Sequence, residues 1–262
     1  MKTKSKIFLA KIISKIITFF ISKNQIVIRN KINWSLNLDE GIDLSIFLFG
    51  SSEKKVLNFS KLLQKKNTPI IIIDIGANIG SVSLIMAKKL ENSKVFAIEP
   101  TNYAFQKLSK NLDLNDDLKD KIFLKQLFIS NNKKPQKVWS SWNFEKSDNK
   151  HQKHMGTLKE IKENSYIGLE KFIETEKLTN VDFIKLDVLK SGETFLAKTK
   201  PIIFIELAPY LYPEFGYSCE ELVKFIISLN YSFLDENLIK IEDIFSVIKN
   251  MKDGSSRNFF LI

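Results

Sequence analysis

The sequence predicts an α/β fold in which a mostly parallel sheet carries helices on both faces. Strand-like apolar runs alternate with helical patterns through most of the 262 residues, an order typical of parallel sheets. One run, I-I-I-I at residues 70–73, leads into Asp74, two glycines four residues apart and an apolar helical segment. The length suits one large α/β domain with modest additions.

The composition excludes several classes of site and partner. Cys219 is the only cysteine, which rules out an intrachain disulfide and a zinc site built on thiolates, and which fits a reducing compartment. The net charge is +10, but only two of the cationic residues are arginines, Arg29 and Arg257, and the lysines are scattered. Because phosphate and base recognition favour the guanidinium group, we expect no nucleic-acid partner.

Residues 1–24 are predicted to form an amphipathic helix of their own. Its polar positions share one helical face, and large apolar residues fill the remainder. The polar positions are Lys4, Lys11, Ser14, Lys15, Thr18 and Ser22. The lysines interrupt the apolar run, so a membrane-spanning helix does not fit, and no signal-peptide cleavage pattern follows. Two interpretations stay open: the helix lies on an anionic membrane surface, or it packs on its own domain or a partner. We expect a cytoplasmic protein, peripheral on the inner membrane face under the first interpretation.

The remaining residues, 25–262, are predicted to form one domain with an N-terminal part at 25–66 and a core at 67–262. In the N-terminal part, alternating apolar residues predict strands at 26–29, 32–38 and 42–50, followed by a helix at 52–64. In the core, strands are expected at 70–73, 94–98, 121–129, 181–188, 202–207, 231–234 and 258–262, with a further one at 137–144. Helices are expected at 81–90, 103–112, 169–176 and 218–229, the last opened by a capping box of Ser218 and Glu221.

The turn after residues 70–73 is the first candidate site, because ligands of such sheets bind beyond the carboxyl ends of the strands. Gly76 and Gly80 allow a tight turn and close approach of a ligand, and the following helix points free N–H groups toward it. Glu99 ends the next strand, where a carboxylate can accept two hydrogen bonds from a ribose diol. Asn78 can bond its own loop or the ligand.

These features suit any cofactor that carries adenosine, and the sequence motifs that bind phosphate groups distinguish between such cofactors. A dinucleotide fingerprint needs a second glycine where Asn78 stands, and a Walker A loop needs G-K-S/T after the position of Gly80. Neither is present, and an acidic residue leading the loop suits a cationic ligand better than a pyrophosphate. S-adenosylmethionine fits, since it offers a ribose, an ammonium and a sulfonium, and no phosphate.

The sequence resembles the FkbM-type methyltransferases from about residue 33 to its end. The motifs that carry the resemblance are D-I-G-A-N-I-G at 74–80, A-I-E-P at 97–100 and V-D-F-I-K-L-D-V at 181–188; K-P-I-I-F-I-E at 200–206 and E-G-I-D-L at 40–44 are similar too. The resemblance implies a class I methyltransferase fold, a Rossmann-like sheet of seven strands whose last strand, at 258–262, runs antiparallel. It also implies methyl transfer from S-adenosylmethionine to an oxygen, often on a sugar or other secondary metabolite.

The resemblance also assigns cofactor-binding residues. Matched to the family motifs, the cofactor turn contains Asp74, Gly76, Ala77, Asn78 and Gly80. Glu99 holds the ribose with Pro100 beside it, and Asn131, just past the next strand, lines the adenine.

The sequence departs from the family pattern after Asp187. The family usually continues with an acidic residue and a glycine, whereas Val188 is followed directly by L-K-S-G at 189–192. Either about seven residues are missing, or Gly192 and Glu193 match the glycine and acid and the following helix is truncated. Thirteen residues, 189–201, remain for the crossover to the next strand, near the minimum of about 10–12. We expect only a short helix at 193–198.

Three residues are candidate catalytic groups, because a sugar hydroxyl needs a general base. Asp187 ends the central strand and is the first candidate, although it can instead bond the cofactor amine or cap the next helix. Glu206 ends the following strand. His151, with His154 in a long polar segment, is a third candidate or a solvated surface residue. Acceptor and metal are not named by the sequence. A catalytically silent relative serving as a binding module is the main alternative, favoured by the shortened segment; an NAD-dependent oxidoreductase is a weaker one.

Overall fold

A computed structural model describes residues 3–53, 56, 59–60, 63, 69–130, 137–139, 158–160, 166–186, 192–252 and 254–262. Its centre is a seven-stranded sheet in the order β12-β13-β11-β10-β3-β4-β5. The strands are β3 (Ile70–Ile75), β4 (Ser93–Ile98), β5 (Ile122–Lys125), β10 (Phe183–Leu186), β11 (Ile202–Leu207), β12 (Phe233–Leu234) and β13 (Arg257–Leu261). β13 is antiparallel to both of its neighbours, and the other paired strands are parallel. This is the predicted class I methyltransferase arrangement, including its antiparallel last strand.

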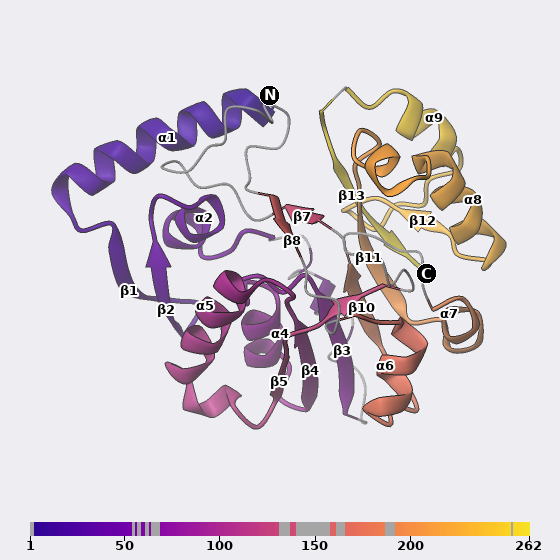
Figure 1. The fold of residues 1–262 in the computed structure, drawn as a ribbon, viewed down its shortest axis with the longest axis horizontal. Helices are drawn as coiled ribbons and strands as arrows, with labels where there is room; N and C mark the ends of the chain where they lie inside the picture. The colour runs from indigo at the N-terminus through magenta and orange to yellow at the C-terminus, as the bar shows by residue number, and fades with distance from the viewer. Residues whose placement is uncertain are drawn as a thin grey trace.

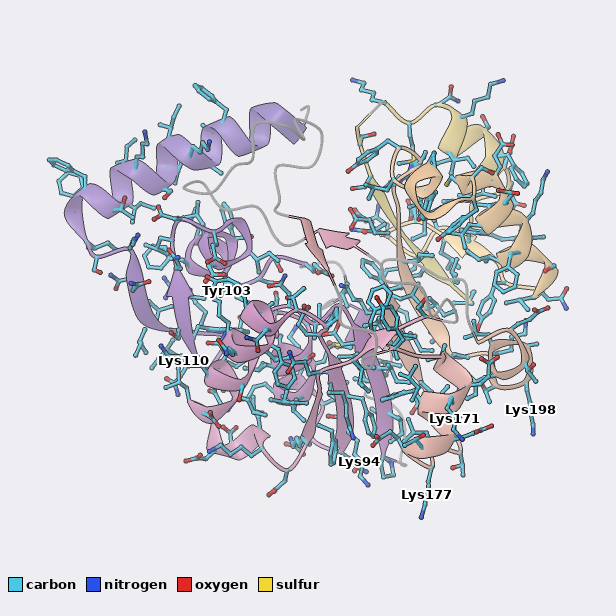
Figure 2. The ribbon with its side chains drawn as sticks, viewed as in Figure 1. Lys94, Tyr103, Lys110, Lys171, Lys177 and Lys198 are labelled. Atoms are coloured by element: carbon cyan, nitrogen blue, oxygen red, sulfur yellow. The ribbon has the colours of Figure 1, made fainter. Side chains whose placement is uncertain are left out.

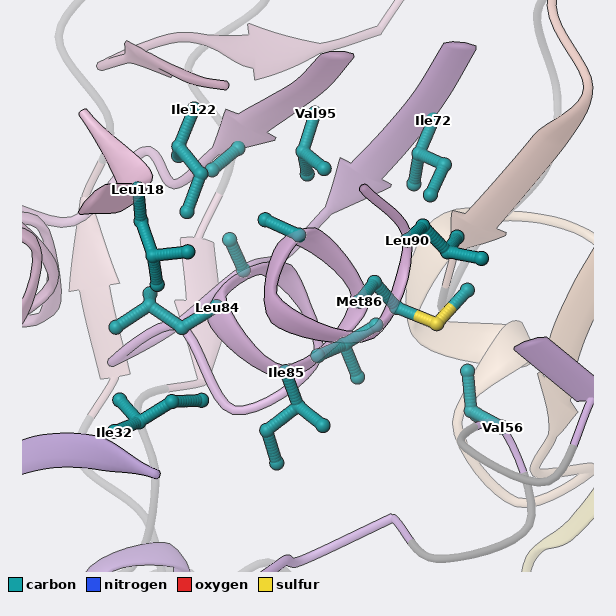
Figure 3. Close-up of a cluster of buried hydrophobic side chains, with 14 of the residues drawn as sticks. Ile32, Val56, Ile72, Leu84, Ile85, Met86, Leu90, Val95, Leu118 and Ile122 are labelled. Carbon is teal, nitrogen blue, oxygen red and sulfur yellow. The ribbon is translucent and has the colours of Figure 1, made fainter. Parts of the chain in front are cut away.

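Helices cover both faces of the sheet, as the alternation of elements predicted (Figure 1). One face packs against α4 (Ser83–Lys89) and α5 (Asn102–Asp113), and the other against α6 (Leu169–Thr175), α7 (Glu193–Thr199), α8 (Cys219–Ser228) and α9 (Ile244–Lys249). Successive strand residues divide between two buried clusters: Ile72 belongs to the first and Ile73 to the second. Figure 3 shows the first cluster gathered around α4. The contiguous apolar strands follow from this burial on both faces.

An N-terminal layer covers the first face beside α5. It contains α1 (Thr3–Phe20), β1 (Asn24–Arg29), β2 (Ile32–Asn37) and α2 (Gly41–Phe49), and β1 pairs antiparallel with β2. The first two predicted strands are therefore confirmed, but the strand predicted at 42–50 is wrong, because this segment is helix α2. Gly50 ends α2 in the left-handed conformation, φ 78°, and donates its N–H to Ile46. A short apolar run is compatible with both the helical and the strand period, and here Gly50 at the C-terminal cap favours the helix.

Smaller elements refine the prediction. The single strand expected at 121–129 is two, β5 and β6 (Phe128–Ile129), and β6 pairs with β9 (Tyr166–Ile167) in a separate sheet. β7 (Lys137–Trp139) pairs with β8 (Leu158–Glu160), and the rest of the strand predicted at 137–144 lies outside the described residues. Within the predicted helix at 52–64, Ser52 and Glu53 are not helical, whereas the other described residues, Val56, Phe59, Ser60 and Leu63, are helical. α9 was not predicted. The capping box that opens α8 is confirmed.

Candidate functional site

The turn between β3 and α4 folds back onto the end of β4. The backbone N–H groups of Gly76 and Ala77 both donate to the carbonyl oxygen of Ile98, at 2.9 Å each. Gly76 and Asn78 have φ of 78° and 52°, in the left-handed region that glycine and asparagine tolerate best. The motif therefore builds a compact loop at the carboxyl end of the central strand, where the sequence predicted it.

Glu99 closes this loop from the neighbouring strand. Its Oε2 accepts the backbone N–H of Asn78 at 3.0 Å, and its Oε1 accepts the N–H and the hydroxyl of Thr101 at 2.9 and 2.6 Å. The side chain is only 5% exposed, and burial raises the pKa of its carboxyl group against the opposing effect of these donors. A carboxylate oxygen has two lone pairs, so Oε2, with the Asn78 N–H as its donor among the described hydrogen bonds, keeps capacity for a further one.

Asp74 lies inside the turn rather than on its surface. The residue has 0% exposure, and its Oδ2 accepts a 2.5 Å hydrogen bond from the hydroxyl of Ser83 on α4. In the structure this carboxylate joins strand β3 to the helix that follows it. Its contact with a cofactor stays a prediction, and the role visible here is to hold the turn together.

Gly80 serves packing. Its φ is 92°, and a Cβ at this position would lie 2.3 Å from Leu84 Cδ1 and 2.8 Å from Leu108 Cδ1. Real Cβ contacts are longer, so a side chain would force two buried leucines on α4 and α5 to move. We expected this glycine to allow close approach of a ligand, and that stays a prediction; the structure shows that it also makes room for the core beneath the turn.

Several predicted cofactor-binding residues of the turn are partly exposed to solvent. Ile75, Gly76 and Asn78 are accessible on the loop itself, and Pro100 is accessible on the segment after β4. Ala77 is 4% exposed. Of the predicted cofactor residues, the structure thus brings Asp74, Gly76, Ala77, Asn78, Gly80, Glu99 and Pro100 to one edge of the sheet. Asn131 lies outside the described residues.

Lys185 is a residue of this edge that the sequence analysis did not single out. It pairs in register with Asp74 across β10 and β3, and it is only 6% exposed. Its Nζ lies 3.4 Å from the carbonyl oxygen of Gly76 and 4.0 Å from Glu53 Oε1. Burial raises the pKa of Glu99, and the charge of Lys185 partly opposes that rise. A lysine is rarely this buried without a charged partner. The motif I-K-L-D contained it, but nothing in the pattern indicated that its ammonium group turns under the loop.

A second charged cluster joins the N-terminal layer to the helix that follows Glu99. Lys107 on α5 lies 3.0 Å from Glu40 Oε2 and 2.5 Å from Asp43 Oδ2, and both acids are buried. Tyr103, at the start of α5 where it meets α2, donates its hydroxyl to Glu40 (Figure 2). Burial raises the pKa of Asp43 to about 6, while Lys107 opposes the shift. This cluster anchors the upstream motif E-G-I-D-L beside the candidate site.

A comparison with protein families decides the assignment. Residues 74–233 match the model described as the methyltransferase FkbM domain, which is more than half of the chain. The chain belongs to the FkbM methyltransferase family. A curated relative, methyltransferase sdnD of Sordaria araneosa, is 49% identical over 47 residues. That match covers only 18% of this chain and 18% of the relative.

Solved structures of methyltransferases are similar to this FkbM chain at lower identity. An FkbM methyltransferase from Methylobacillus flagellatus KT is 17% identical, with 81% of this chain and 48% of that chain covered, at a TM-score of 0.46. TYW2 of M. jannaschii, solved in complex with AdoMet, is 13% identical over 91% of this chain and 84% of its own, at a TM-score of 0.41. At these identities the likeness concerns the fold alone.

The crossover from β10 to β11 contains the short helix that the sequence predicted at 193–198: α7 has seven residues, Glu193–Thr199. Gly192 precedes it with φ 94°, and a Cβ there would lie 2.5 Å from Leu169 Cδ2. Glu206, near the carboxyl end of β11, is partly exposed, whereas Asp187 and His151 lie outside the described residues. No group of three or more metal-ligating side chains occurs among the residues that the structure describes.

Proposed function

We propose that this chain is an S-adenosylmethionine-dependent O-methyltransferase whose acceptor is a hydroxyl of a glycan or related metabolite. Membership of the FkbM family supports methyl transfer, and one observation supports the cofactor: the Asn78 N–H bonds Glu99 Oε2. That bond joins the turn after β3 to the acid at the end of β4. The result is a loop and an adjacent hydrogen-bond acceptor at the edge where ligands of such sheets bind.

The donor and acceptor groups at this edge fit S-adenosylmethionine. Glu99 offers an oxygen to a ribose hydroxyl, Gly76 and Asn78 present accessible backbone, and Pro100 flanks them. The loop lacks both phosphate signatures, which disfavours a dinucleotide. When bound, S-adenosylmethionine supplies an electrophilic methyl group on a sulfonium. The chain's task is then to align the acceptor oxygen at about 3–3.5 Å from that carbon and to accept its proton.

Glu206 is the described residue best suited to accept that proton. It lies on β11, two strands beyond β3, and Glu99 follows β4 on the other side of β3. Three interstrand spacings of about 4.8 Å therefore separate the proposed ribose acceptor from the proposed base. A ligand extended along the sheet edge reaches from one to the other. Asp187 and His151 remain alternative bases.

Calorimetric titration with S-adenosylmethionine tests the cofactor assignment. We expect Glu99→Gln to weaken binding at least about tenfold, because its amide nitrogen cannot accept the donors that the carboxylate accepts. Glu91→Gln is the matched control, since Glu91 is an exposed acid just before the other end of β4. Thermal unfolding verifies that both variants fold. Absence of binding by the wild-type chain, or equal loss in both variants, would overturn the assignment.

Turnover on a panel of glycan acceptors separates an enzyme from a silent binding module. The short crossover at α7 is the observation that favours the silent alternative. We expect Glu206→Gln to lower kcat at least about a hundredfold with cofactor binding intact, as loss of a general base does. Glu220→Gln is the control, because Glu220 is an exposed acid on α8. Tight cofactor binding by the wild type without turnover on any acceptor would identify the silent module.

A further inference from the structure

Helix α1 is held against the domain by the side that carries its small and polar residues. Ser14 is fully buried, and its hydroxyl donates to Asp39 Oδ1 at 3.3 Å. Ile17, one turn further, packs against the main buried cluster, and Lys23 lies 3.7 Å from the same Asp39. The helix therefore has a fixed rotation about its axis, set by contacts on one side.

The opposite side of α1 is apolar and faces solvent. Phe8, Phe19 and Phe20 are 66%, 84% and 78% exposed, and Leu9, Ile12 and Ile16 are 40–57% exposed. Positions 8, 12, 16 and 19 recur at helical spacing and so form one stripe. Strand β1 continues the apolar surface along the chain, with Ile26 and Ile28 exposed by 67% and 66%. An apolar stripe of this size on an outer helix is typical of an interaction surface.

The charge of this segment indicates which partner the stripe meets. Residues 1–38 contain eight Lys and Arg residues and no Asp or Glu. Lys15 is exposed beside the stripe. Other lysines lie on separate elements: Figure 2 shows Lys94, Lys171, Lys177 and Lys198 pointing outward from β4, α6, the segment after α6 and α7. A second copy of this chain would bring two cationic segments together, so the charge disfavours self-association and favours an anionic surface.

The length and composition of α1 fit a helix lying flat on a bilayer. Among the described helices, none is both long and apolar enough to cross a membrane. α1 lies along the outer edge of the molecule in Figure 1, outside α2. Its stripe is exposed from Phe8 to Phe20. Interfacial helices combine large apolar side chains on one face with lysines at its border, where the ammonium groups reach lipid phosphates.

We infer that residues 8–28 form a membrane-docking surface, which inserts the α1 stripe into an anionic bilayer and places Lys15 at the headgroups. The hydrogen bond from Ser14 to Asp39 holds the polar side of α1 against the domain, and the stripe on the opposite side therefore faces outward. This inference concerns a surface outside the proposed active site and does not depend on the methyl-transfer assignment.

Vesicle sedimentation of the full chain tests the inference. We expect binding to vesicles of phosphatidylcholine and phosphatidylglycerol in a ratio of about 7:3, and little binding to phosphatidylcholine alone. Raising the salt from about 0.1 M to about 1 M shortens the screening length from about 10 Å to about 3 Å and should weaken binding. The double variant Phe19→Ser/Phe20→Ser should bind at least about tenfold more weakly, and Lys15→Glu several-fold more weakly.

Matched controls separate this surface from general stickiness. Ile239→Ser removes a large apolar side chain that is 63% exposed and remote in sequence from α1, and Lys171→Glu reverses an exposed charge on α6. Both variants should bind like the wild type. Three results would overturn the inference: no binding of the wild type to anionic vesicles, equal losses in the controls, or a dimer in solution that Phe19→Ser/Phe20→Ser dissociates. The last result would assign the stripe to self-association.

Discussion

The turn after β3 and helix α1 of the N-terminal layer use their side chains in opposite ways. In the turn, charged groups are buried and hydrogen-bonded within the chain, as Asp74 is to Ser83 and Glu99 to Asn78. In the N-terminal layer, α1 buries Ser14 and leaves Phe19 84% exposed. The turn therefore bonds its charged groups within the chain, whereas α1 presents large apolar side chains to solvent.

The greatest loss of stability is expected where the turn packs on the core. Gly80→Ala should lower the free energy of unfolding by about 3 kcal/mol, through left-handed backbone strain and displacement of Leu84 and Leu108. Gly216→Ala is the matched control, because Gly216 has a φ of 79° and a Cβ added there would meet no atom of the described residues within 4 Å. Its cost should be about 1 kcal/mol, from strain alone. Urea unfolding measures both, and equal losses would show that Gly80 is needed only for its dihedral angles.

The second effect concerns the buried carboxylate of the turn. Ser83→Ala removes a 2.5 Å donor to Asp74 and should lower the free energy of unfolding by about 2 kcal/mol, as loss of a partner does for a buried charged group. Ser228→Ala, on the exposed end of α8, should cost less than about 0.5 kcal/mol. If urea unfolding finds the two variants alike, the bond between Ser83 and Asp74 does not support the turn.

The sheet was predictable because its strands are apolar on both faces. Short apolar runs such as 70–73 and 202–207, separated by helical segments, are typical of buried parallel strands. The glycines after residue 73 and Glu99 then indicate the edge of the sheet where ligands bind. Segment 42–50 was predicted wrongly because a short apolar run fits both periods. Its stop signal, Gly50, was present in the sequence but could equally have ended a strand.

The polar contacts of the site were not predictable, because they depend on which side chains the fold brings together. Lys185 stands in a motif that was recognised, yet only its pairing with Asp74 places it beneath the turn. The rotation of α1 is a similar case. The helical pattern separated a polar from an apolar face, but the bond from Ser14 to Asp39, 25 residues away, determines which side turns inward.

A third prediction compares the two regions through pH. The pKa of Asp43 is raised from 3.8 to about 6, so the folded state holds a proton that the unfolded state releases between these values. The contribution of this group to stability therefore falls as pH rises through that window. Asp43→Asn should reduce the fall in the free energy of unfolding over this pH range by an amount on the order of 1 kcal/mol. The fall that remains is due to Glu99, whose pKa is raised as well.

Urea midpoints measured from about pH 4 to about pH 7 follow this change. Asp117→Asn is the control, because Asp117 is exposed and Lys88 lowers its pKa, which gives a slope of the opposite sign and small size. If the stability of Asp43→Asn depends on pH as the wild type's does, burial does not raise the pKa of the Asp43 carboxyl group.

The weakest effect on stability is expected on the outward side of α1. Phe19→Ser should change the free energy of unfolding by less than about 0.5 kcal/mol, because this ring is 84% exposed and has little contact with the domain to lose. Ile17→Ser, on the inward side of the same helix, should cost about 1 kcal/mol or more, since Ile17 packs on the core. Urea unfolding in the absence of lipid measures both. A large loss at Phe19 would mean that the stripe stabilises the fold itself, and the contrast between a self-contained turn and an outward-facing N-terminal layer would fail.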